Sequence, residues 1–322
     1  CDFEKKESIM KKYYRAIIFL LIAFLVHGCI QIDSQEIYWM LSKNKKDLYA
    51  LIIYRDIYAT IDKDSKKSAS EQLDSSVKEI EEDFFNGNKI FILCNEKKHE
   101  FDLEPYKDGL PELPRSGETK NEFKFFNHLV NNTEIRGGAL FKERSEDETS
   151  SHVLCAYQVI RLKNVKKLFP LMNALLSDAI IKGEPSNEDF PLSFNQWREI
   201  AKKGNWRWCQ MDKTSFIVNL PMHQDEYFSY RNHILGDYGY IMANNFFGII
   251  QKADRIQLVL GDPQLKVNSY KYDINKHNEY SNLLPLIEKS VFWDDEIDPQ
   301  EIIQQFTKDP QTFFNSMKKR EP

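Results

Sequence analysis

A short apolar segment near the start of the chain constrains the fold more than any other feature. Residues 16–26 form an unbroken apolar run, and the basic residues Lys11, Lys12 and Arg15 precede it. An apolar helix needs roughly 20 residues to cross the hydrocarbon core of a bilayer, so this run is too short to span one. A basic start followed by an apolar core of this length is typical of a secretion signal. The segment therefore predicts that the rest of the chain is exported.

The apolar run ends in the sequence Leu25-Val26-His27-Gly28-Cys29. This pattern resembles the lipobox of bacterial lipoproteins, in which an aliphatic residue stands three positions before a cysteine and a small residue stands directly before it. His27 occupies a position where a small or aliphatic residue is usual. The resemblance covers the leader alone. It implies that a fatty acid such as palmitate is attached at Cys29, that Cys29 becomes the mature N-terminus, and that the protein is held on the membrane of the cell envelope.

Three other interpretations of this segment stay open: an ordinary secretory signal, an uncleaved anchor, and a buried helix with a chance cysteine. We expect residues 1–28 to form the leader, with translation starting at Met10, because acidic residues in 1–9 do not suit the basic start of a signal peptide. Residues 10–28 are then the signal peptide. If the host has two membranes, Ile30 supplies no aspartate-type retention signal, and resemblance to sorted lipoproteins implies the outer membrane.

The composition excludes some partners and chemistries. The chain has 49 acidic and 44 basic residues, a net charge of −5, so it lacks the basic surface of a nucleic-acid-binding protein. At 42% hydrophobic and 13% aromatic residues, it can bury a substantial core. Beyond Cys29 the cysteines are Cys94, Cys155 and Cys209, which allow at most one disulfide. We expect them to be mainly buried thiols.

Hydrophobic periodicity predicts a mixture of strands and helices. Arg55-Asp56 marks a bend in the second strand, and Asp298-Pro299 and Asp309-Pro310 each place a capping aspartate before a proline at the first helical position. We predict strands at 36–41, 48–61, 89–94, 99–103, 152–162, 206–210, 214–220, 255–260 and 266–272, and helices at 65–86, 164–183, 193–204, 221–235 and 238–252. Because helices alternate with hairpins, the fold class is predicted to be α+β, in two layers, with a mainly antiparallel sheet and helices on one face.

A polar segment in the middle of the chain predicts a boundary. Gly137-Gly138 is followed by the polar run at 142–151, a composition typical of linkers. We therefore expect an N-terminal α+β region at 29–140, a linker or mobile loop at 141–151, and a C-terminal α+β region at 152–322. The alternative is that the two regions form one domain.

The sequence contains no G-x-S-x-G, Walker, G-x-G-x-x-G or H-E-x-x-H motif. One group with suitable metal ligands is His223, Asp225, Glu226 and His233, because imidazoles and carboxylates bind zinc and other transition metals. The alternative interpretation is the solvated first turn of a helix, where acidic residues favour the helix dipole.

Two further groups contain side chains that are capable of chemistry. Asp294, Asp295, Glu296 and Asp298 offer carboxylates for calcium, but the alternating ligands and glycine of an EF-hand loop are missing. Cysteine catalysis needs a nearby base, and the sequence places none beside Cys155 or Cys209.

Aromatic residues are concentrated around residues 227–247. Tyr227, Tyr230, Tyr238 and Tyr240 either belong to a large aromatic core or form an exposed patch that binds a partner.

We therefore predict a membrane-tethered, non-catalytic lipoprotein that binds a protein of the envelope or acts as an immunity-type partner. It needs no cofactor beyond its covalent lipid. The alternatives are an envelope hydrolase whose site forms only in three dimensions, and a lipoprotein that binds a small molecule or a metal.

Overall fold

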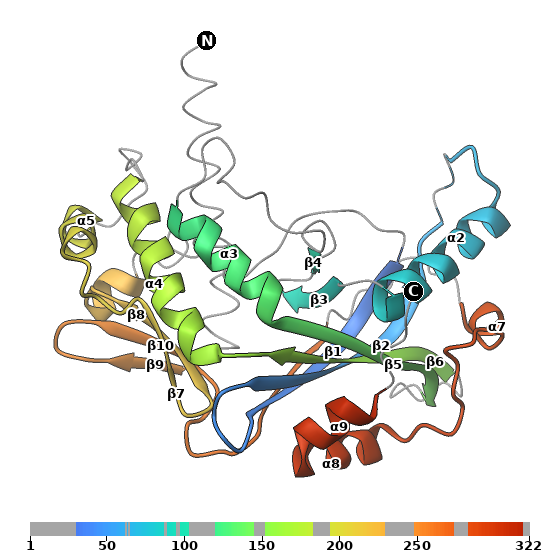
Figure 1. Ribbon diagram of the computed structural model, residues 1–322. Coiled ribbons are helices and arrows are strands. Elements are labelled where there is room, and N and C mark those ends of the chain that lie inside the picture. Colours follow the sequence, from blue (N-terminus) through green and yellow to red (C-terminus); the bar gives the residue numbers. More distant parts are fainter. Residues whose placement is uncertain are drawn as a thin grey trace. The chain divides into compact units, whose positions relative to one another are not determined.

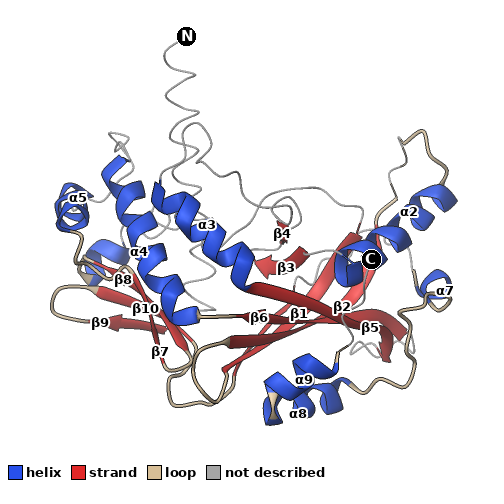
Figure 2. Cartoon of the chain, viewed as in Figure 1, coloured by secondary structure: helices blue, strands red, loops and turns tan. Residues whose placement is uncertain are grey.

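The computed structural model describes residues 30–61, 63, 65–86, 89–94, 97–102, 120–144, 152–182, 194–228, 248–273 and 283–317. The chain divides into two compact units, and each is described by itself. The five-stranded unit contains the described residues of 30–102, 132–163 and 269–317, and the four-stranded unit contains those of 120–131 and 164–268. Antiparallel strands and helices occur in both units, so the predicted α+β class is confirmed (Figures 1 and 2).

The five-stranded sheet has the order β11-β1-β2-β6-β5. Its strands are β1 (Ile30–Leu41), β2 (Leu48–Ala59), β5 (Thr133–Arg144), β6 (His152–Leu162) and β11 (Asn268–Asp273). The strands β1, β2, β6 and β5 are antiparallel to their neighbours, and β1 pairs with β2 over its full length, from Ile30 opposite Ala59 to Leu41 opposite Leu48. Aromatic and β-branched residues are frequent in β2, which suits a half-buried pleated surface.

The predicted bend in β2 is confirmed. Asp56 adopts a left-handed conformation with a φ of 53°, which is uncommon for a residue other than glycine. Strand pairing continues on either side of it, with Ser34 opposite Arg55 and Ile32 opposite Ile57. The sheet therefore bends at Asp56 without losing its register.

One face of the sheet is covered by the segment that follows β2 and by one short helix from much later in the chain. These elements are α2 (Ala69–Glu81), a π-helical turn η1 (Glu82–Asn86), β3 (Lys89–Cys94), β4 (Lys97–Asp102) and α7 (Leu284–Ile287) (Figure 1). Tyr54 of β2 packs edge-on against Phe84 and Phe91, with ring centroids 4.9 and 6.2 Å apart. A capping box between Ser68 and Glu71 starts α2, as expected for the helix predicted at 65–86.

The opposite face is covered by α8 (Pro299–Lys308) and α9 (Pro310–Ser316) (Figure 1). Phe314 packs edge-on against Tyr49, with ring centroids 5.9 Å apart. Asp298 and Asp309 cap the two helices, and a proline follows each, which confirms the sequence prediction. Helices thus lie on both faces of this sheet, whereas the two-layer prediction placed them on one, because β2 buries both sets of its alternating side chains.

The predicted linker falls within a hairpin of the five-stranded unit. Residues 141–144 belong to β5, which pairs with β6 from Thr133 opposite Leu162 to Arg144 opposite His152. A register shift occurs between Gly137 and Leu140. Residues 145–151 lie outside the described residues.

The four-stranded unit contains a sheet of order β7-β8-β10-β9. Its elements are α3 (Lys120–Asn132), α4 (Val165–Lys182), α5 (Phe194–Lys203), β7 (Cys209–Asp212), β8 (Ser215–Leu220), β9 (Gly248–Gln251) and β10 (Ile256–Leu260). The Asn173 side chain of α4 donates to the Cys209 carbonyl and accepts from the Cys209 N–H, which fixes the helix to the sheet. The helix predicted at 238–252 is wrong at its end, because residues 248–251 form β9 and pair with β10.

Candidate functional site

The first strand begins directly after the cysteine of the predicted lipobox. Ile30 is the first residue of β1, its side chain is only 1% exposed, and it pairs with Ala59. Cys29 itself lies outside the described residues, but it is bonded to Ile30. The residue bonded to the predicted lipidation site is therefore already paired within the sheet, with no intervening spacer.

A lysine from a neighbouring strand holds the start of β1. Lys98 of β4 donates from Nζ to the carbonyl oxygen of Ile30 at 2.6 Å. Its ammonium group also lies 4.9 Å from the centre of the Phe91 ring. Burial lowers the pKa of Lys98, and the nearby carboxylates of Glu79 and Glu100 oppose that shift. The backbone at Ile30 is thus fixed by a charge-assisted hydrogen bond as well as by strand pairing.

Lys98 belongs to a cluster of ionisable side chains beneath the sheet. Lys89 Nζ lies 2.7 Å from Asp83 Oδ1 and 3.1 Å from Glu100 Oε1. Burial raises the pKa of Asp83 despite its bond to Lys89, and burial also raises the pKa of Glu79. Perturbed groups of this kind occur both at functional sites and in structural ion networks. Here the oppositely charged groups tie η1, β3 and β4 together behind the start of β1.

A second polar group crosses four adjacent strands on the α8–α9 face. Arg55 Nη1 of β2 lies 3.0 Å from Glu36 Oε1 of β1, and Arg55 Nε lies 2.6 Å from Glu143 Oε2 of β5. The Cys155 thiol of β6 donates to Glu143 at 3.7 Å. Burial and the Glu143 carboxylate raise the pKa of Cys155, so the thiolate needed for nucleophilic attack does not form at neutral pH.

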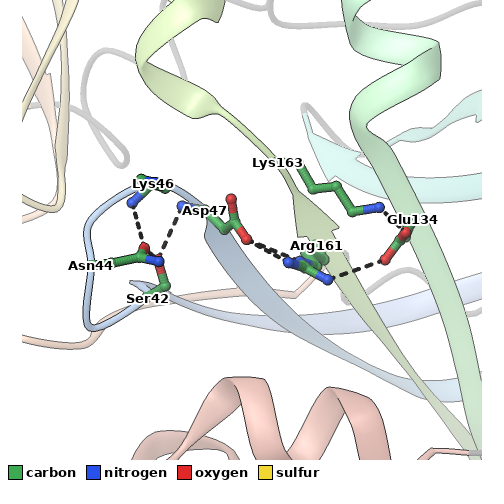
Figure 3. A network of polar contacts seen from close by, with 7 residues as sticks. All are labelled: Ser42, Asn44, Lys46, Asp47, Glu134, Arg161 and Lys163. Carbon is green, nitrogen blue, oxygen red and sulfur yellow. Dashed lines mark hydrogen bonds and ion pairs between the residues drawn. The ribbon is translucent and has the colours of Figure 1, made fainter.

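A third polar network lies at the other end of β2 (Figure 3). Arg161 of β6 donates from Nη2 to Asp47 Oδ2 at 2.7 Å, and its Nη1 lies 3.6 Å from Glu134 Oε2. Lys163 forms a further ion pair with Glu134. The network links the turn before β2 to β6 and β5, so it fixes the ends of three neighbouring strands.

The turn between β1 and β2 is stabilised by its own side chains (Figure 3). The Ser42 hydroxyl accepts from the Asp47 N–H at 3.0 Å, and Asn44 Oδ1 accepts from the Lys46 N–H at 2.9 Å. Local bonds of this kind are typical of Ser and Asn in turns. The carboxylate of Asp47 is therefore held in position for Arg161.

The residues of the predicted metal site are only partly described. His223 and Asp225 are exposed and Glu226 is half-buried, at the start of a helical turn at 224–228. Among the described residues, no three His, Cys, Asp or Glu side chains are placed to hold a metal ion. His233 lies outside the described residues, so the four-residue site stays a prediction.

The acidic group near the C-terminus has backbone partners. Asp294 Oδ1 accepts from the Glu296 N–H at 3.1 Å, and Asp298 Oδ1 accepts from the Gln300 N–H at 2.8 Å. These bonds stabilise a turn and the start of α8.

Of the tyrosines considered for partner binding, Tyr227 is described and fully buried. Its ring therefore cannot contribute to an exposed patch, which corrects the sequence interpretation for this residue. The neighbouring Phe228 is 42% exposed, and its ring packs edge-on against Tyr227 with ring centroids 5.5 Å apart. Tyr230, Tyr238 and Tyr240 lie outside the described residues, so their role stays a prediction.

Sequence reasoning missed the contacts that hold the start of β1. It placed the first strand at 36–41, and its strand at 99–103 begins one residue after Lys98. The signal available was the position of Ile30 next to Cys29, but the carbonyl of Ile30 meets Lys98 only in three dimensions.

Comparisons of the chain with protein-family models, with curated proteins and with solved structures found no match. Among the helices that the structure describes, none combines the length and the apolar character required for a bilayer crossing.

Proposed function

We propose that the chain is an exported lipoprotein of the bacterial cell envelope, anchored through acylated Cys29, that acts by binding a protein partner. The observation that carries this proposal is the start of β1 at Ile30, whose side chain is buried. The basic and apolar leader precedes the lipobox cysteine, and strand β1 follows it directly. Cleavage before Cys29 would leave every residue of β1 in place.

The anchor has a sound energetic basis. Each acyl CH₂ group buried in the membrane contributes about 0.8 kcal/mol, and two or more chains together hold a protein stably. Attachment therefore requires nothing from the folded units. If the host has two membranes, Ile30 after Cys29 favours the outer membrane.

Binding is proposed in preference to catalysis because the polar groups described above are used within the fold. Arg55 is paired with Glu36 and Glu143, and Arg161 is paired with Asp47. Burial raises the pKa of the Cys209 thiol to about 12, so this cysteine is also a poor nucleophile at neutral pH.

The anchor is tested by intact mass spectrometry and detergent phase partitioning of the protein expressed in a bacterial host. The unchanged chain is compared with Cys29→Ala, and with Cys209→Ala as a control that removes a buried cysteine outside the leader. We expect the unchanged chain and the control to begin at Cys29, carry acyl mass and enter the detergent phase. The Cys29→Ala variant should do none of these.

An unacylated chain in the aqueous phase would overturn the lipoprotein assignment.

The binding role is tested separately by photo-crosslinking in intact cells from the exposed position 228. A discrete crosslinked envelope protein is the expected result. Turnover of an envelope substrate by the purified protein would contradict the non-catalytic role.

A further inference from the structure

We infer that the five-stranded unit is held directly against the lipid headgroups, with the strand end that contains Ile30 towards the membrane and the β1–β2 turn away from it. This inference rests on the proposed lipidation of Cys29. It adds an orientation and a contact surface, which the presence of an anchor alone does not require. The occupant of that surface is the headgroup layer of the membrane that carries the anchor.

The first step of the argument is the length of the connection. Consecutive Cα atoms are about 3.8 Å apart, so the lipidated residue cannot lie farther than this from Ile30. A flexible spacer would allow the fold to move away from the membrane, but Ile30 already pairs with Ala59. The anchor is therefore bonded directly to the sheet.

The second step is the rigidity of the attachment point. The side chain of Ile30 is 1% exposed, and its carbonyl accepts the 2.6 Å hydrogen bond from Lys98. Moving the membrane away from this strand end would require Ile30 to leave the core and lose both interactions. Each such loss is unfavourable, because a buried side chain and a buried charged donor would be left without their partners.

The third step identifies what else lies at this end. The antiparallel register places the end of β2 at Ala59, the end of β5 at Arg144 and the start of β6 at His152 on the same side as Ile30. Arg144 and His152 at the ends of β5 and β6 are exposed, and so is Lys63, four residues after the end of β2. Charged side chains suit the hydrated headgroup layer and resist burial in hydrocarbon. The contact is therefore with headgroups.

The fourth step gives the scale of the orientation. Strand β1 has 12 residues, and a rise of about 3.3 Å per residue separates its two ends by roughly 36 Å. The turn that contains Lys46, and the Asp47–Arg161 network of Figure 3, lie at the far end. The membrane should therefore be close to residue 60 and distant from residue 46.

The test uses a fluorescent label at one of two exposed positions, introduced by Thr60→Cys or Lys46→Cys. The acylated protein is placed in phosphatidylcholine vesicles that contain lipids with a nitroxide on the headgroup, which quenches only at short range. The same chain without an added cysteine measures background labelling. We expect quenching at position 60 to be at least about threefold stronger than at position 46, because the two ends lie roughly 36 Å apart.

A spacer variant provides the matched control. Ten Gly/Ser residues inserted between Cys29 and Ile30 have an end-to-end distance of about 16–19 Å, so they should sharply reduce quenching at position 60. Equal quenching at the two positions in the acylated protein, or no effect of the spacer, would overturn the orientation and leave the lipoprotein proposal standing. A chain without acyl mass would overturn both.

Discussion

The side chain of Gln35 gives the sharpest test of how the five-stranded unit is held together. Gln35 is fully buried in β1. Its Nε2 donates to the Phe91 carbonyl at 2.6 Å, and its Oε1 accepts from the Leu93 N–H at 3.0 Å. The Gln35 side chain thus satisfies two backbone groups of β3 that a neighbouring strand would otherwise satisfy. Gln35→Ala would leave a buried acceptor and a buried donor without partners.

The expected cost follows from those two groups. Each unsatisfied buried polar group costs about 1–3 kcal/mol, so Gln35→Ala should lower the free energy of unfolding by about 2–6 kcal/mol. Gln35→Glu keeps an acceptor for Leu93 but places a carboxylate oxygen against the Phe91 carbonyl. Burial should raise the pKa of this glutamate above its unfolded value of about 4.3. Stability is then retained at low pH and lost as the pH rises through the folded pKa.

Urea unfolding and amide hydrogen exchange of residues 89–94 measure these effects. Gln304→Ala, on the exposed side of α8, is the control and should change the free energy of unfolding by less than about 0.5 kcal/mol. The reasoning is refuted if Gln35→Ala behaves like that control, or if exchange of the Leu93 amide stays as slow as in the unchanged chain. Either result would mean that the two hydrogen bonds contribute nothing that water cannot replace.

Three further predictions concern single side chains. Burial, and then the 2.8 Å hydrogen bond to Glu36, raise the pKa of Tyr38 to about 12. Because the folded pKa lies above the unfolded value, the stabilising contribution of Tyr38 is present below about pH 10 and is lost towards pH 12. Tyr38→Phe should remove this pH dependence, as measured by tyrosinate absorbance and by unfolding experiments. Gly137→Ala would place a Cβ atom 2.1 Å from the Phe84 carbonyl oxygen, so the free energy of unfolding should fall by more than about 2 kcal/mol; a variant as stable as the unchanged chain would contradict this packing. Because burial raises the thiol pKa of Cys209 to about 12, this cysteine should resist iodoacetamide at pH 8 in the folded protein and react after denaturation. Peptide mass spectrometry measures the alkylation. Alkylation of Cys209 in the folded protein would show that the thiol is accessible.

The elements that could be predicted from the sequence are those with a strong local signal. The strands at 48–61, 89–94 and 152–162 contain runs of β-branched and aromatic residues, and each matches an observed strand closely. The two Asp-Pro pairs predicted the starts of α8 and α9, because aspartate caps a helix and proline suits its first position. In these segments local preference and tertiary packing agree.

The first half of β1 could not be predicted in this way. Its polar residues resemble a loop, but Asp33 and Gln35 are buried within the sheet. Gln35 is satisfied there by Phe91 and Leu93, which are 56 and 58 residues away along the chain. Periodicity records that a side chain is polar, but not that a distant segment supplies its hydrogen-bond partner. The first half of β1, from Ile30, was therefore missed.

The glycine pair at 137–138 is a second case in which the sequence alone does not reveal the tertiary contact. These glycines predicted a flexible linker, but both lie in β5. A Cβ atom at Gly138 would lie 1.9 Å from the Tyr157 ring, so the absence of a side chain allows close packing. Glycine in a strand often marks a close approach, and sequence alone does not separate this from flexibility.

The position of Ile30 also separates the alternative roles of the leader. An uncleaved apolar segment ending at Val26 would leave three residues before β1, so it would hold this strand end near the membrane much as a lipid on Cys29 would. An ordinary secretory signal would release the strand end altogether. Headgroup quenching at position 60 therefore distinguishes a tethered fold from a free one, whereas intact mass distinguishes a lipid from an uncleaved leader. Because β1 begins directly after Cys29, the two measurements together assign the leader without reference to any partner.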